Sequence, residues 1–299
     1  MVILILQVCM VLFAGTFSVF LGRDVVKHKD TISDKSVAGL AASSGIPLFF
    51  DALGIGSFAP QTTIYKITHL IPDKLIPGSL NVMCAIPCAI SCILYITVIK
   101  VDPLTLFSTV AASAVGAAIG AKFVSKLPEK KIQLGMGLAL IIVAIIMIIR
   151  QLGLMPPGGT AEGLVGWKLI AAIAGCFIIG AVMTIGIGNY GPTMALTYSL
   201  GMSPACAFPI MMASGAYLMT AAGFTFVKEG MYDRKACVVG TFAGAIGIII
   251  AVTLVKSLPL TILTWIVIVA IFYASFMMLR SAFKKAAPET PETPETEAA

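Results

Sequence analysis

Two short glycine and proline sequences hold the residues of this chain that are best suited to bind a ligand. Each has two glycines followed by a proline: Gly54, Gly56 and Pro60 in the first, and Gly186, Gly188 and Pro192 in the second. Proline removes a hydrogen bond from a helix, and glycine weakens the helix further. We therefore predict a break in a helix at each sequence. The N-terminal end of a broken helix exposes N–H groups that favour an anion.

Polar side chains flank both predicted breaks. They are Ser57, Gln61 and Thr62 at the first break, and Asn189, Tyr190 and Thr193 at the second. Hydroxyl and amide groups donate hydrogen bonds to an oxyanion without adding a fixed charge. The alternative is that these groups join helices by hydrogen bonds, and that the four glycines only allow close packing. No Lys or Arg lies inside either break, so anion binding is expected to depend on backbone dipoles.

Asp51 lies three residues before the first break and is the only acid between Lys35 and Lys66. An ionised carboxylate in a membrane segment is costly, and such acids usually face a cavity. The equivalent residue of the second sequence is Met183. We interpret Asp51 as a coupling or gating residue, because its ionised form would repel an anion and its neutral form would admit one. The alternative is a carboxyl that caps exposed N–H groups or pairs with a loop lysine.

The two breaks belong to an internal repeat. At an offset of 132 residues, the Gly-Ile-Gly and its proline recur, and Pro72 and Pro77 recur as Pro204 and Pro209. At an offset of 131, Asp102 matches Asp233, Gly116 matches Gly247, and Leu127-Pro128 matches Leu258-Pro259. Each half has four segments: 37–70, 75–99, 103–121 and 132–149 in the first, and 168–200, 205–227, 236–255 and 260–279 in the second.

Composition predicts the class of protein that contains this repeat. Apolar residues make up 59% of the chain and charged residues 11%, and the mean hydropathy is +1.01. An average soluble domain carries about 25% charged residues. Residues 169–227 contain no charged side chain, and about 20 apolar residues span a bilayer as a helix. The net charge of +6 comes from short basic clusters rather than a continuous face, which argues against nucleic acid as a partner.

Basic residues predict how the segments cross the bilayer, because Lys and Arg favour cytoplasmic loops. If 37–70 and 168–200 fold back as hairpins, sixteen of the twenty basic residues lie on one side, in 22–36, 66–75, 122–131, 228–235 and the C-terminus. If each of the two segments crosses once, thirteen lie inside and seven outside. The hairpin arrangement is therefore favoured. It predicts an all-α polytopic membrane protein with two inverted repeats and broken or re-entrant helices, a fold typical of secondary transporters.

The predicted organisation has five parts. They are a first transmembrane helix with its cytoplasmic loop (1–36), the first repeat (37–150), an extracytoplasmic linker (151–167), the second repeat (168–282) and a disordered acidic tail (283–299). The N-terminal segment lacks the basic start and small-residue cleavage site of a signal peptide, so it is expected to be retained. The tail repeats Pro-Glu-Thr and has too few apolar residues to form a core.

Other residues with chemical potential receive a structural interpretation. Cys84, Cys88 and Cys92 share one helix face, and without accompanying His or acids we interpret them as small packing residues rather than a metal or redox site. Asp102 and Asp233 are predicted helix caps. Asn81 and Ser214 either line the cavity or pack. No metal and no cofactor is expected, and no H-E-x-x-H or G-x-S-x-G motif points to an enzyme.

The residues at the breaks resemble a known family. Leu53-Gly-Ile-Gly-Ser-Phe-Ala-Pro60 and Ile185-Gly-Ile-Gly-Asn-Tyr-Gly-Pro192, the latter followed by 200–212, are similar to the paired motifs of the TauE/SafE sulfite exporter family, over roughly 37–282. Many members have three glycines at the break, whereas Ser57 and Asn189 follow the second glycine here.

The resemblance implies a multi-pass protein of the cytoplasmic membrane that moves small inorganic or organosulfur anions, of the sulfite, sulfonate or thiosulfate class, by alternating access. A negative interior pushes anions outward with roughly 2.3 kcal/mol per charge per 100 mV, which favours export. An anion channel and a non-transporting scaffold remain alternatives. The oligomeric state is not predicted.

Overall fold

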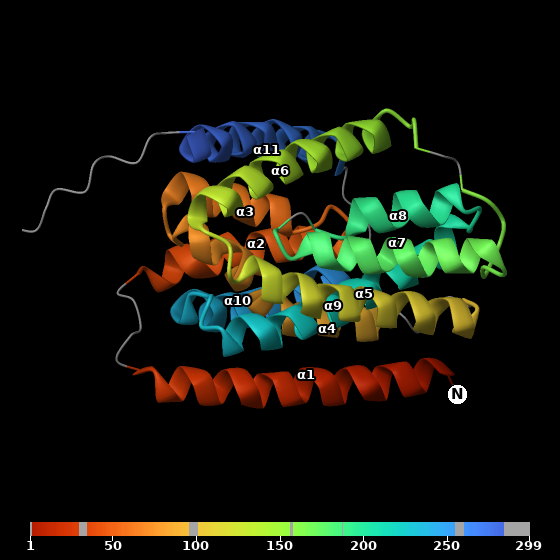
Figure 1. The fold of residues 1–299 in the computed structure, drawn as a ribbon, viewed down its shortest axis with the longest axis horizontal. Coiled ribbons are helices and arrows are strands. Elements are labelled where there is room, and N and C mark those ends of the chain that lie inside the picture. Colours follow the sequence, from red (N-terminus) through yellow and green to blue (C-terminus); the bar gives the residue numbers. More distant parts are fainter. Residues whose placement is uncertain are drawn as a thin grey trace, which may run out of the picture.

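The computed structural model describes residues 2–29, 35–95, 101–155, 158–186, 188–254 and 260–283. In this part the chain forms α-helices joined by short loops, with one isolated bridge between Ala161 and Met202. The helices run side by side, with α1 along one edge and α6 and α11 along the opposite edge (Figure 1). Their bounds are α1 Val2–Lys27, α2 Val37–Ala52, α3 Phe58–Thr68, α4 Ile76–Tyr95, α5 Pro103–Val124, α6 Glu129–Gln151, α7 Trp167–Met183, α8 Tyr190–Ser199, α9 Pro204–Lys228, α10 Arg234–Leu254 and α11 Leu260–Phe283; a short 3-10 turn, η2 (Asp73–Leu75), precedes α4.

The described helices make this chain an all-α, multi-pass membrane protein. Six of them are long and apolar enough to cross a bilayer, namely α1, α4, α5, α6, α9 and α10. The predicted segments agree with the helices to within a few residues, and both predicted interruptions fall between helices, at 53–57 and 184–189. The predicted caps are also confirmed. Asp102 accepts a hydrogen bond from the N–H of Thr105 (2.8 Å), and Asp233 accepts one from the N–H of Ala236 (2.9 Å).

Polar contacts gather several loops at one end of the bundle, which we call the Asp73 end. Lys66 forms an ion pair with Asp73, and Gln133 Nε2 donates to Asp73 Oδ2 at 2.9 Å. Lys35 pairs with Asp233, whose backbone N–H donates to Ser79 Oγ at 2.9 Å. The loops before α2, after α3, between α5 and α6, and between α9 and α10 therefore lie at one end.

The remaining described loops meet at the opposite end, which we call the Asp102 end. The N–H of Asp102 donates to Glu162 O (3.0 Å), and the N–H of Leu164 donates to Thr105 Oγ1 (2.9 Å). The N–H of Ser203, just before α9, donates to Ala161 O at 2.9 Å. The starts of α5, α7 and α9 are thereby held together. Residues 96–100 and 255–259, with Lys100 and Lys256, lie outside the described residues.

Two helical hairpins enter the bundle from opposite ends. In α2–α3, Ser44 Oγ lies 2.9 Å from the Tyr65 hydroxyl, and a Cβ at Gly39 would lie 3.8 Å from a Leu70 methyl. Both ends of this hairpin are therefore at the Asp73 end. In α7–α8, a Cβ at Gly201 would lie 3.5 Å from Lys168 Nζ, so both of its ends are at the Asp102 end.

Glycines let each hairpin pack closely against a helix of the other half of the chain. A Cβ at Gly116 of α5 would lie 2.1 Å from Phe177 O of α7. A Cβ at Gly247 of α10 would lie 2.4 Å from Gly45 O of α2. Neither contact leaves room for a larger side chain, so both pairs depend on the missing Cβ. Between them lie α4 and α9, the two most buried long helices.

We predict that residues 66–75 and 122–131 face the cytoplasm. They lie at the same end of the molecule, and that end carries most of the basic residues. Single cysteines placed in each loop, in a cysteine-free background, should be protected from impermeant thiol reagents in intact cells and should react after lysis. A cysteine in 151–155 at the Asp102 end is the control that should react from outside. Labelling of 66–75 but not 122–131 in intact cells would contradict this orientation.

Candidate ligand site at the helix breaks

A cavity of about 50 Å³ lies between the two breaks. Six of the eleven predicted site residues line it: Asp51, Gly56, Ser57, Gly188, Asn189 and Tyr190. Pro60 and Pro192, which follow the breaks, line it as well. The two sequences 132 residues apart are therefore brought to the two sides of one small space.

The cavity is placed at the N-termini of two helices. Ser57 is the N-cap of α3 and Asn189 the N-cap of α8, and neither side chain caps the first turn of its helix. The first two residues of α3, Phe58 and Ala59, line the cavity, as do their counterparts Tyr190 and Gly191 in α8. First-turn N–H groups have no partner within a helix. Two helix N-termini thus direct N–H groups and partial positive charge toward the same space.

Glycine is required in both breaks because the chain turns there with left-handed backbone angles. The φ angles are +86° and +90° at Gly54 and Gly56, and +108° and +80° at Gly186 and Gly188. Such angles cost an L-residue roughly 1–2 kcal/mol. At Gly56 and Gly188 a Cβ would also lie within 3.8 Å and 3.5 Å of Tyr190 and Phe58, across the space between the breaks.

Asp51 connects the first hairpin to the second. Its side chain is buried, and Oδ2 accepts a hydrogen bond from the Tyr190 hydroxyl at 2.6 Å. Ser57, the N-cap of α3, lines the same cavity as Asp51. Asp51 is in no ion pair with a described lysine or arginine. Tyr190 belongs to α8, so this bond crosses between the two halves of the chain.

Several buried polar atoms near the breaks have no protein partner among the described residues. They are Ser57 Oγ, Thr62 Oγ1, Asn81 Oδ1, Asn189 Oδ1, Thr193 Oγ1 and Ser214 Oγ. Buried polar groups are nearly always hydrogen-bonded, so such a group calls for a ligand or a water. Asn189 lines the cavity; its Nδ2 donates to Met211 O (3.0 Å), and its Oδ1 is left as an acceptor. That acceptor suits a ligand or water that carries an O–H group.

The other predicted residues lie near the cavity without lining it. Gly54 borders a second, adjoining cavity. Gln61 Nε2 lies 3.5 Å from Ser44 O, and its Oε1 lies 3.5 Å from Cys84 Sγ. Thr62, Gly186 and Thr193 line neither space; a Cβ at Gly186 would lie 3.9 Å from Thr62 Oγ1. Ile187, the middle residue of the second motif, is outside the described residues.

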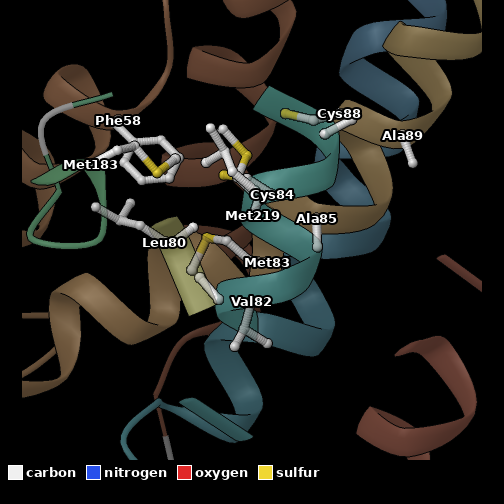
Figure 2. Close-up of a cluster of buried hydrophobic side chains, with 14 of the residues drawn as sticks. Phe58, Leu80, Val82, Met83, Cys84, Ala85, Cys88, Ala89, Met183 and Met219 are labelled. Carbon is white, nitrogen blue, oxygen red and sulfur yellow. The ribbon is translucent and has the colours of Figure 1, made fainter. Parts of the chain in front are cut away.

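Sulfur-containing and apolar side chains pack next to the breaks. Figure 2 shows Phe58 from the start of α3 and Met183 from the end of α7 in one buried cluster with Cys84 and Cys88 of α4 and Met219 of α9. Cys88 Sγ lies 3.9 Å from Asp51 Oδ2. Cys92 is buried too, so the cysteine stripe packs inside the bundle, as interpreted from its spacing.

Sequence reasoning placed Arg150 at the end of the first repeat, among the few basic residues outside the cytoplasm, and gave it no role at the site. It lies in the last turn of α6, and its Nη1 donates to Gly54 O at 2.8 Å. Its side chain lines the cavity with Val143, Ile146 and Met147 from the same helix. Neither break contains a lysine or arginine, as the sequence shows, but Arg150 brings a cation to the first break from α6. The available signal was the position of Arg150 one residue beyond a long apolar run.

Comparison of the chain with protein-family models, with curated proteins and with solved structures found no match.

Proposed function

We propose that this protein transports small sulfur-containing oxyanions across the cytoplasmic membrane, with the anion bound between the two breaks. The observation that carries this proposal is the convergence of two uncapped helix N-termini, α3 and α8, on one cavity inside an apolar bundle. Such ends bind anions. The resemblance of both break sequences to the TauE/SafE motifs supports the sulfite, sulfonate or thiosulfate class. Export down the membrane potential is the direction that needs no coupling.

We also infer that the two halves are inverted repeats. In support, α4 runs from the Asp73 end toward the Asp102 end, and α9, its counterpart 132 residues later, runs the opposite way. The close contact between Gly116 and Phe177 has its counterpart in the contact between Gly247 and Gly45, as the repeat offsets require. Two re-entrant hairpins that meet at a central site suit alternating access, in which one repeat moves against the other.

The small size of the cavity favours a carrier over an open anion channel. Its volume is only about 50 Å³. Buried side chains close the bundle toward the Asp73 end, where Lys66 bonds to Asp73 and to Ser281 Oγ. A passage through that end therefore requires these contacts to rearrange, which is the behaviour of a gated carrier.

The proposal predicts uptake of a sulfur oxyanion into proteoliposomes that contain the purified full-length chain, with the potential and pH gradient set separately. Gly56→Val and Gly188→Val should each lower this uptake about tenfold or more, because the added side chain enters the space between the breaks and tenfold requires only about 1.4 kcal/mol. The control is Gly230→Val, since Gly230 also has a positive φ (+66°) but faces open space.

The site is supported if the wild type and Gly230→Val take up the anion at similar rates. Gly56→Val and Gly188→Val should then be folded but should have lost most of their uptake. Absence of flux for sulfite, sulfonates and thiosulfate in the wild type would exclude the proposed function. Equal losses in all three valine variants would indicate backbone strain rather than a ligand site.

Asp51 is proposed to gate this site by ionisation. The groups that face Asp51 are the Tyr190 hydroxyl of α8, the Cys84 and Cys88 thiols of α4, and Ser57. Arg150 of α6 lines the same cavity. Anion binding should then be strong below the pKa of Asp51 and weaken as pH rises through it, because the carboxylate repels the ligand. Asp51→Asn keeps the shape and cannot ionise, so its thiosulfate uptake should lose this pH dependence. An unchanged pH profile in Asp51→Asn would show that the acid is structural.

A further inference from the structure

Arg150 separates two adjoining cavities. The inner one lies between the breaks; the outer one, of about 140 Å³, is lined by residues that include Leu53, Gln151 and Thr264. Ile55, Met147 and Arg150 line both. Gln151 ends α6, and Thr264 lies in the first turns of α11, so the outer cavity extends toward the Asp102 end. A ligand that moves between the breaks and that end passes the Arg150 side chain.

The guanidinium of Arg150 is held in place but is not neutralised by the described part of the chain. One of its five N–H donors bonds to Gly54 O at 2.8 Å. No described carboxylate forms an ion pair with it, whereas the described ion pairs of Lys35, Lys66 and Arg234 all involve an aspartate. The side chain is exposed rather than packed away. A cation within a membrane bundle is costly unless it faces water or a charged ligand.

The first-half break also fixes where this cation points. Gly54, at φ +86°, accepts the hydrogen bond of Arg150 with its carbonyl oxygen, and a Cβ at Gly54 would lie 3.9 Å from Nη2. The positions that align with Arg150 are Ser281 and Ala282 in α11, and Arg280, one residue earlier, makes no hydrogen bond or ion pair with the described residues of the second break. Ser281 instead accepts a hydrogen bond from Lys66. The Arg150 arrangement is therefore specific to one end of the molecule.

We propose that Arg150 forms a second oxyanion site, in the outer cavity, which captures the anion on the Asp102 side of the breaks. A guanidinium offers paired N–H donors to an oxyanion and stays ionised at every physiological pH. This inference rests on the proposed function and deepens it. Arg150, outside the breaks, would recognise the charge of the substrate. The backbone dipoles of α3 and α8 would hold it at the deeper site between the breaks.

The test is the concentration dependence of thiosulfate uptake, with the anion added from the Asp102 side of oriented proteoliposomes at constant ionic strength. Arg150→Gln should raise the half-saturating concentration about tenfold, equivalent to about 1.4 kcal/mol. The maximal rate should change less, and Arg150→Lys should be intermediate because it keeps the charge but loses the fork geometry. The matched control is Arg280→Gln, which removes an exposed arginine from the last turn of α11 and should leave both constants unchanged.

A structural role for Arg150 predicts a different result. Arg150→Gln would then lower the maximal rate and the melting temperature of the ligand-free protein while leaving half-saturation unchanged, and this outcome would overturn the proposal. Equal effects of Arg150→Gln and Arg280→Gln would also overturn it, because they would reflect general surface charge.

Equilibrium binding separates this inference from the transport proposal, and lipid composition separates a soluble anion from a lipid phosphate. Thiosulfate should raise the melting temperature of the purified wild-type protein, and Arg150→Gln should need about tenfold more thiosulfate for the same rise, even if the wild type moves no anion. Absence of any thiosulfate effect on the wild type would overturn the inference. An Arg150 effect on binding that is confined to vesicles with anionic lipid would assign the guanidinium to a headgroup and would also overturn it.

Discussion

Non-helical backbone at two helix breaks inside an apolar bundle is the constraint on which the rest of this structure depends. Non-helical backbone at membrane depth is tolerated only where protein or a wet cavity surrounds it. The fold meets this requirement by bringing the two breaks together, so that residues 55–57 and 188–189 border one cavity that α6 and Met219 of α9 also line. The hairpins can reach that depth because glycines in α5 and α10 allow their backbones to approach closely.

The charged residues of the site occur in the first half of the chain only, although the glycines and prolines of the breaks occur in both halves. The glycines, prolines and helix starts recur in both halves, but Asp51 and Arg150 have no charged counterparts, since Met183, Ser281 and Ala282 occupy the corresponding positions. The Asp51–Tyr190 hydrogen bond joins the two hairpins directly. Any change in the charge of Asp51 therefore acts on the contact between the halves. Elements from both halves of the chain line the cavity, and Asp51 and Arg150 are the two charged side chains among its lining residues.

Much of the fold could be predicted because it follows from local physics. Uncharged runs set the helix bounds, Gly54, Gly56 and Pro60 set the first break, and Asp102 and Asp233 set two helix starts. The two hairpins were predicted from the distribution of lysines and arginines between the two sides of the membrane. Other features depend on which helices become neighbours, which a single sequence does not state. The bond from Tyr190 to Asp51 and the reach of Arg150 to the Gly54 carbonyl are contacts between residues 139 and 96 positions apart. Thr62 and Thr193 have the right type and spacing for the site, but helix rotation leaves them off the cavity wall.

The central claim is that an oxyanion binds between the N-termini of α3 and α8. Selenite has the shape and charge of sulfite, and its selenium can be located directly by anomalous scattering. Diffraction from crystals of the full-length protein, grown with selenite in place of sulfite, is therefore the most direct measurement. The account predicts an anomalous peak beside Ser57 and Asn189, absent in crystals of Gly188→Val. Selenium peaks only at surface lysines, with none between the two breaks, would contradict it.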